Sequence, residues 1–217
     1  MEQGSSEVAN VAWFKLAECV GRGEKERALG LYRLLIHSLD DPAFIKKLEA
    51  ELLSPFNIQE AEILYIEAAD LYKKAGQPGE SALIYEHLVR LSPKNSFYVE
   101  KLIHYGIDLG WEEKTFLYRK KLCFLFLEKG KIEKGLKLYT LLEEFLKDAD
   151  KFDFYQAFTL AALTHKYTEQ KYITLYLEKS IDSFLRMGDE KELQHFISKL
   201  KALNVVWHKD AIEYLKK

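Results

Sequence analysis

Apolar residues recur at spacings of three and four along almost the whole chain. Ile63, Ile66, Ala69 and Leu71 form one such series. This spacing places apolar side chains on one face of an α-helix, whereas a half-buried strand would alternate apolar and polar positions. The pattern therefore predicts an all-α protein.

Short breaks at glycine, proline and asparagine divide this pattern into separate helices. Connections this short make consecutive helices pack antiparallel, and helices of this length must bury their apolar faces against a neighbour. We therefore expect helical hairpins as the building unit. The predicted helices span residues 8–21, 24–39, 42–53, 58–75, 79–91, 95–108, 112–129, 132–148, 152–167, 170–187, 190–202 and 208–216.

Composition and charge narrow the class of protein. The 217 residues are 48% hydrophobic and 30% charged, which suits a chain with a sizeable core and not a disordered one. The 32 basic and 34 acidic side chains give a net charge of -2, a poor fit to a nucleic-acid partner. Because no low-complexity linker interrupts the pattern, we expect one domain over residues 1–217.

One segment, residues 62–95, shows a repeat-like order of aromatic, small and helix-ending positions. Ala69 and Ser81 are small where two helices would cross, so that the backbones can approach closely. The segment closely resembles the tetratricopeptide repeat, a helical hairpin. The residues that carry the resemblance are Tyr65, Ala68, Ala69, Tyr72, Gly76, Ser81, Tyr85, Leu88 and Pro93.

Weaker copies of this hairpin follow other glycines that would end a helix. Gly76 and Gly110 are 34 residues apart, which is the usual period of the resembled family, but Gly23 and Gly130 lie 53 and 54 residues from Gly76. An extra helix is therefore expected between some hairpins. The resemblance implies antiparallel hairpins stacked as an irregular, right-handed superhelix of about 11 or 12 helices. The copies pair a glycine with a residue five positions later: Gly23 with Ala28, Gly130 with Gly135, and Gly188 with Leu193.

Motifs for catalysis and nucleotide binding are missing from the sequence. The one Gly-Lys pair is Gly130-Lys131, and Ile132 follows where a phosphate-binding loop needs serine or threonine. The segment from Gly21 to Gly23 reads as the end of a helix. No Gly-x-Ser-x-Gly or His-Glu-x-x-His motif occurs. We predict a protein that is not an enzyme and uses no cofactor.

Candidate metal ligands are few. Glu192 pairs with His195 and Glu100 with His104 at helical spacing, but the further carboxylates of a helical metal centre are missing, so no metal site is predicted. The acidic segment 148–153 is expected to form a solvated turn and a helix cap.

Cysteine usage and hydropathy bear on the cellular compartment. Cys19 and Cys123 are too few and too far apart for a disulfide framework, and we expect both to pack as small apolar residues. The start of the chain has no secretory signal, and no apolar run approaches the roughly 18 residues that span a bilayer. We predict a cytoplasmic protein without membrane insertion.

The resemblance also implies a binding surface, because the first helix of each tetratricopeptide hairpin lines the concave groove. This surface is mixed in charge with apolar patches, as suits a peptide or protein partner. We therefore predict a non-enzymatic interaction scaffold, of chaperone or adaptor type. Glu67 stands where chaperone-tail-binding members have an asparagine, so no carboxylate clamp is expected. The groove residues are Ile63, Ile66, Glu67, Asp70, Lys73, Lys74, Lys101, His104, Lys120, Lys121 and Phe124.

Two alternatives remain open. An enzyme or small-ligand receptor would need a buried polar pocket around Glu192 and His195. A self-assembling structural protein would use the charge asymmetry between residues 1–92, at -5, and residues 93–217, at +3, together with 13 Tyr, 13 Phe and 3 Trp side chains. The predicted groove is either open or filled by the terminal helix around residues 207–215.

Overall fold

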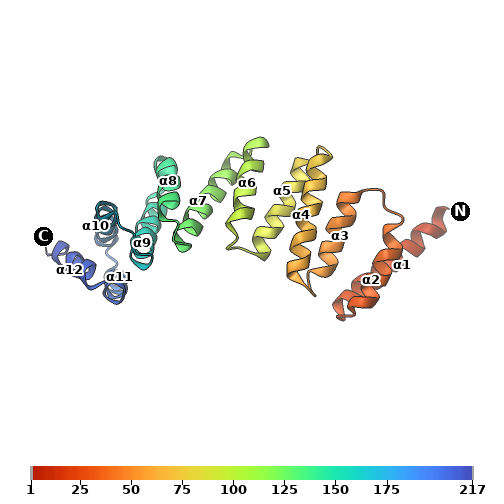
Figure 1. Ribbon diagram of the computed structural model, residues 1–217, viewed down its shortest axis with the longest axis horizontal. Helices are drawn as coiled ribbons and strands as arrows, with labels where there is room; N and C mark the ends of the chain where they lie inside the picture. The colour runs from red at the N-terminus through yellow and green to blue at the C-terminus, as the bar shows by residue number, and fades with distance from the viewer. Residues whose placement is uncertain (1, 217) are drawn as a thin grey trace. The chain divides into compact units, whose positions relative to one another are not determined.

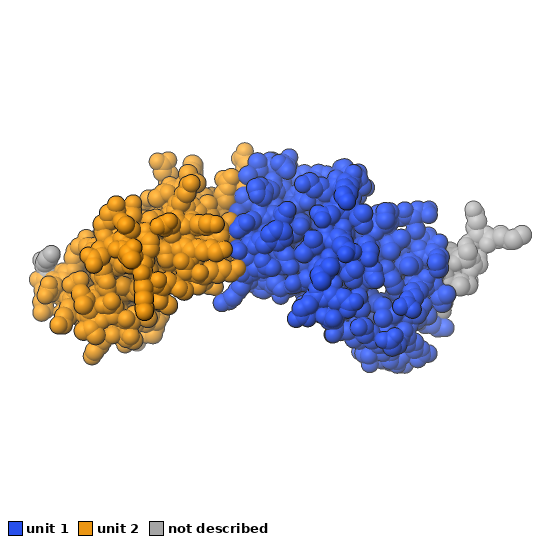
Figure 2. All heavy atoms as spheres, viewed as in Figure 1, with its two compact units in different colours: residues 1–111 blue, residues 112–217 orange. Residues whose placement is uncertain are grey.

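The computed structural model describes the backbone of residues 2–216 and the side chains of residues 12–216. Twelve α-helices and one short 3-10 helix make up this described range, which contains no strand (Figure 1). The prediction of an all-α protein is therefore confirmed. The chain divides into two compact units, residues 1–111 and residues 112–217 (Figure 2). A single domain stays a prediction, and each unit is described by itself.

Unit 1 consists of six helices, and consecutive helices pack side by side and run in opposite directions (Figure 1). Their bounds agree with the predicted ones to within a few residues, except that the first helix begins six residues earlier. The helices are α1 (Glu2–Gly21), α2 (Lys25–Ile36), α3 (Pro42–Leu53), α4 (Ile58–Lys74), α5 (Pro78–Leu91) and α6 (Ser96–Asp108).

Unit 2 holds six further α-helices and the 3-10 helix. Its core is aromatic: the rings of Tyr139 and Phe154 stack with their centres 3.6 Å apart, and Tyr176 packs edge-on against both. The elements are α7 (Glu112–Glu128), α8 (Ile132–Leu142), η1 (Glu143–Phe145), α9 (Asp148–Thr164), α10 (Gln170–Met187), α11 (Glu190–Leu203) and α12 (Val205–Tyr214).

The predicted helix over 132–148 is wrong at its end. The α-helix stops at Leu142, and after η1 the backbone of Leu146 is extended, with φ -80° and ψ 140°. The next helix starts at Asp148, so the acidic segment lies within α9, with Asp148 and Asp150 in its first turn, and Lys147 is the capping residue. Carboxylates are favourable near the positive end of a helix dipole, which explains why the helix starts there instead of at residue 152.

The terminal helix α12 packs on α10 and α11 within unit 2. Trp207 contacts the aromatic core and also the second apolar cluster, formed by α10, α11 and α12. Near the other end of α12, the hydroxyl of Tyr214 donates to Asp182, 3.0 Å away. The helix therefore completes the core of its own unit.

The crossing of α4 and α5 is close because both helices present small residues there. Ala69 and Ser81 are fully buried, and the Ser81 hydroxyl donates to the Ala69 carbonyl at 2.8 Å. The Tyr105 hydroxyl of α6 lies 2.7 Å from the same Ser81 oxygen. Since the single serine proton goes to the carbonyl, the tyrosine is the donor in the second bond. The predicted crossing point is confirmed.

A second crossing, of α7 with α8, repeats this arrangement. Cys123 and Gly135 occupy it, and the Cys123 thiol lies 3.1 Å from the Gly135 carbonyl oxygen. Each pair of crossing residues is twelve positions apart, as in Ala69 and Ser81. A Cβ atom on Gly135 would lie 2.7 Å from Leu127 Cδ2, so glycine is needed for this approach.

Glycines with positive φ end the helices where the sequence predicts. At Gly76, φ is +74°, and its N–H donates to the Lys73 carbonyl at 3.1 Å while that of Gln77 donates to Tyr72 at 2.9 Å. These two bonds satisfy carbonyls that the helix leaves unpaired at its end. Gly23, Gly110, Gly130 and Gly188 have the same conformation.

The end of α9 uses the same turn without a glycine, which the sequence analysis missed. Lys166 has φ +54°, and the N–H of Tyr167 donates to the Ala162 carbonyl at 2.8 Å. The helix ends at Thr164 and not at the predicted residue 167. A lysine in this region of backbone conformation carries a steric cost that glycine avoids.

We predict that Gly135→Leu lowers the free energy of unfolding by about 1–3 kcal/mol, because the new side chain would overlap Leu127 and the α7 backbone. Gly30→Leu is the control, since no atom lies within 4 Å of a Cβ at that exposed helical position. Urea unfolding measures both. Equal effects of the two substitutions would contradict a close crossing at Gly135.

We also predict that Lys166→Gly raises the free energy of unfolding by about 1 kcal/mol, because it relieves the left-handed conformation of a residue with a Cβ. The matched control is Lys199→Gly, which replaces an exposed lysine inside α11 and should destabilise by about 1 kcal/mol. A loss of stability in Lys166→Gly would show that the turn does not have this conformation in solution.

Candidate functional site

Two helices of unit 1, α4 and α6, lie next to each other and run in the same direction. The Tyr98 hydroxyl donates to the Glu62 carboxylate at 3.0 Å, and the Lys73 ammonium lies 6.0 Å from the centre of the Tyr105 ring. These contacts join positions 36 and 32 apart, on either side of the 34-residue period. Helix α5 packs against both helices, so their exposed sides face the same way, away from α5.

The exposed sides of these two helices combine apolar and charged groups. Ile63 is 59% exposed, Phe97 46% and Ile107 55%. Glu67 forms an ion pair of 3.4 Å with Lys46 of α3. We call this surface the α4–α6 face, and it comprises Ile63, Glu67, Asp70, Lys74, Phe97, Lys101, His104 and Ile107.

The structure brings together the predicted groove residues of unit 1. Ile63, Glu67, Asp70, Lys73, Lys74 and His104 are exposed, and Ile66 and Lys101 are half-buried, all on α4 or α6. Phe97 and Ile107 are not among the predicted groove residues. Both were predictable, because they follow Ile63 and Lys73 by the same 34 positions that relate Glu67 to Lys101.

The remaining predicted groove residues lie on α7 in unit 2. Lys120, Lys121 and Phe124 are half-buried. The Lys120 ammonium is paired with the Asp150 carboxylate of α9, and the Phe124 ring lies 6.4 Å from that of Phe154. Two of the three side chains therefore take part in the packing of their own unit, and their place in a partner groove stays a prediction.

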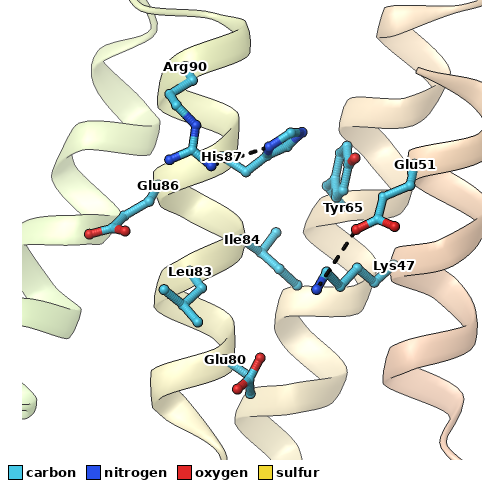
Figure 3. Close-up of a pocket in the computed structure, with 9 residues that line it drawn as sticks. All are labelled: Lys47, Glu51, Tyr65, Glu80, Leu83, Ile84, Glu86, His87 and Arg90. Carbon is cyan, nitrogen blue, oxygen red and sulfur yellow. Dashed lines mark hydrogen bonds and ion pairs between the residues drawn. The ribbon is translucent and has the colours of Figure 1, made fainter. Parts of the chain in front are cut away.

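A polar pocket of about 300 Å³ lies between α3 and α5, over α4 (Figure 3). The Tyr65 ring stands 4.8 Å from that of His87, and Lys47 pairs with Glu51 at 3.8 Å. Burial is the main cause that lowers the pKa of His87, and the nearby Arg90 adds to it. Burial also raises the pKa of Tyr65 to about 12.

The imidazole of His87 is incompletely paired. Its Nδ1 lies 3.5 Å from the Arg90 guanidinium, while its buried Nε2 has no hydrogen-bond partner among the described residues. A neutral imidazole in this pocket can donate or accept one hydrogen bond at Nε2. The pocket therefore offers a polar contact at Nε2 of His87.

The other candidates from the sequence do not assemble into a centre. Glu192 and His195 are exposed on α11, so they do not form the buried polar pocket that an enzyme would need there. Within residues 12–216, no group of three or more His, Cys, Asp or Glu side chains is placed to hold a metal ion. Both cysteines are buried and free, as predicted, and burial raises the pKa of Cys123 to about 12.

The chain matches no protein-family model, and no curated protein is similar to it in sequence. In the part of the chain that the structure describes, no helix is both long enough and apolar enough to cross a membrane.

We predict that His87→Leu makes the protein less sensitive to acid. The pKa of His87 is lowered in the folded protein, so the unfolded chain binds the proton more readily and stability falls as the pH drops below about 6.5. Urea unfolding from about pH 8 to pH 5 should show a smaller loss of stability in His87→Leu and in His87→Gln than in the wild type. An unchanged pH profile in both variants would contradict a desolvated His87.

Proposed function

We propose that this protein is a non-enzymatic scaffold that binds a peptide or protein partner on the α4–α6 face. The observation that carries the proposal is the exposure of Ile63, Phe97 and Ile107, at 59%, 46% and 55%, on one side of two adjacent helices. Large apolar side chains of this kind, set among charged ones, are typical of surfaces that anchor a partner.

The packing behind this face supports the proposal. Ala68, Ala69, Val99 and Leu102 are fully buried on the opposite sides of α4 and α6. The two helices are therefore held by their own core, and the exposed groups are in place before a partner arrives. Binding to such a pre-organised surface loses less conformational entropy than binding to a flexible one.

The spacing of the contacts supports a tetratricopeptide-like arrangement of this scaffold. Parallel neighbours about 34 positions apart, with an antiparallel helix behind them, are what stacked helical hairpins produce. Two free, buried cysteines favour a reducing compartment, in keeping with a cytoplasmic adaptor or chaperone.

We predict that Ile63→Glu combined with Phe97→Glu reduces capture of a partner at least about tenfold, because two apolar anchors are replaced by charges. The purified chain serves as bait in lysate at two salt concentrations, and mass spectrometry identifies the retained proteins. Leu34→Glu with Leu83→Glu is the matched control, since both leucines are exposed on other helices of unit 1.

Circular dichroism and thermal melting should show that both double variants stay folded. The proposal fails if the two variants retain the same partners to the same extent. It also fails if the wild type retains no partner and instead forms oligomers that grow with concentration, which would favour self-assembly.

A further inference from the structure

Unit 2 has a trough between α8 and α10 that is separate from the α4–α6 face. The trough has a volume of about 440 Å³, and Leu136 and Tyr176 line it together with Tyr167 and Tyr172. A second hollow of about 330 Å³ continues from it toward the α7–α8 turn, since Tyr167 lines both. We call the two hollows together the tyrosine trough.

The floor of the tyrosine trough is packed against the aromatic core. Tyr176 is 4% exposed, and its ring packs 4.5 Å from that of Phe158 and 5.5 Å from that of Phe154 in the core. One turn further along α10, Lys179 pairs with Glu143 of η1 at 3.5 Å. An apolar group that enters would meet aromatic surface without a rearrangement of the core.

The rim of the tyrosine trough is basic. Lys137 and Lys171 line the hollow between α8 and α10, and Lys131, the capping residue of α8, lines the second hollow with Lys134. The ammonium groups of Lys131 and Lys134 each lie 5.9 Å from the centre of the Phe126 ring of α7. Two carboxylates, Glu133 and Glu169, also line it, and Glu169 pairs with Lys171 at 3.9 Å. Four cations against two anions favour an anionic occupant.

The length of the tyrosine trough and its two glutamate carboxylates restrict the type of anion that it can bind. From Lys131 to Thr140, helix α8 rises about 14 Å, which is the length of about four extended residues. The two glutamates would repel a nucleic-acid backbone, which carries a charge on every nucleotide, more than they would a peptide with spaced charges. Aromatic surface between lysines suits apolar side chains that alternate with carboxylates.

We propose that the tyrosine trough binds a short, extended, acidic peptide segment in which large apolar side chains alternate with carboxylates. The apolar side chains lie on Tyr172 and Tyr176, and the carboxylates face Lys134 and Lys137. This is a second binding surface, and it does not depend on the α4–α6 face.

The probe is a fluorescein-labelled, C-terminally amidated peptide that alternates Glu with Leu and Phe over seven residues. Amidation excludes recognition of a free carboxyl end. Fluorescence anisotropy with the full chain should show binding that weakens as salt rises, and the same peptide with Gln in place of Glu should bind at least about tenfold more weakly.

Two variants test the location. Lys134→Glu with Lys137→Glu, and separately Tyr172→Ala, should each weaken binding of the Glu peptide roughly tenfold. The control is Lys199→Glu with Lys201→Glu, which makes the same charge change on exposed positions of α11 and should alter binding less than about twofold. Thermal melting verifies that every variant is folded.

Several results would overturn the proposal. The charge variants of the trough and of α11 could weaken binding of the Glu peptide equally. The Glu peptide could also fail to bind, or an oligothymidine probe could bind more strongly than the peptide. A dimer of the chain that Lys134→Glu with Lys137→Glu disrupts would assign the trough to a second copy instead. Ile63→Glu with Phe97→Glu should leave peptide binding unchanged, so failure of the proposed function and failure of this inference are distinguishable.

Discussion

The close approach of paired helices at small residues is the constraint on which both units depend. At the crossing of α4 with α5, Ser81 and Ala69 bring the backbones near enough for a side chain of one helix to bond the main chain of the other. Cys123 and Gly135 do the same for α7 and α8. In each pair the residues lie twelve positions apart, with a glycine-ended turn between them. The position at which the turn ends the first helix therefore determines which residue of the second helix lies at the crossing.

The aromatic side chains take their places from these crossings. Once α4 and α5 are close, Tyr85 fills the space toward α6, where its ring lies 5.7 Å from that of Tyr105. Tyr105 in turn reaches back to Ser81. The third helix is therefore held by contacts to both helices of the preceding pair, and α4 and α6 become parallel neighbours. Their outward sides are left to solvent, and the exposed Ile63 and Phe97 lie there.

Much of the fold was predictable because its signals are local. Apolar spacing gave the helices, and glycine gave the ends at residues such as Gly76, whose φ is +74°. The end of α9 was not predictable in this way, because Lys166 adopts the same left-handed conformation although it is not a glycine. The break after Leu142 was missed for a similar reason, since neither glycine nor proline marks it.

The candidate sites were predictable only in part. The 34-residue offset relates one helix to its parallel neighbour, so most residues of the α4–α6 face could be predicted from the period. The tyrosine trough has no such signal, because Lys137 and Tyr172 are brought together by the packing of α8 and α10 around the core. The pocket between α3 and α5 (Figure 3) also has no signal in the sequence. Tyr65 and His87 belong to different helices, and the Nε2 atom of His87 is buried by tertiary packing.

The alternating directions of the helices also have an electrostatic consequence. Each α-helix carries a dipole equivalent to roughly half a charge at either end. In unit 1 these dipoles oppose one another from helix to helix, and their sum over six helices is close to zero (Figure 1). The long-range field of unit 1 is therefore left to its side chains. Residues 1–111 carry 12 basic and 17 acidic groups, and residues 112–217 carry 20 and 17, so the two units present fields of opposite sign to an approaching molecule.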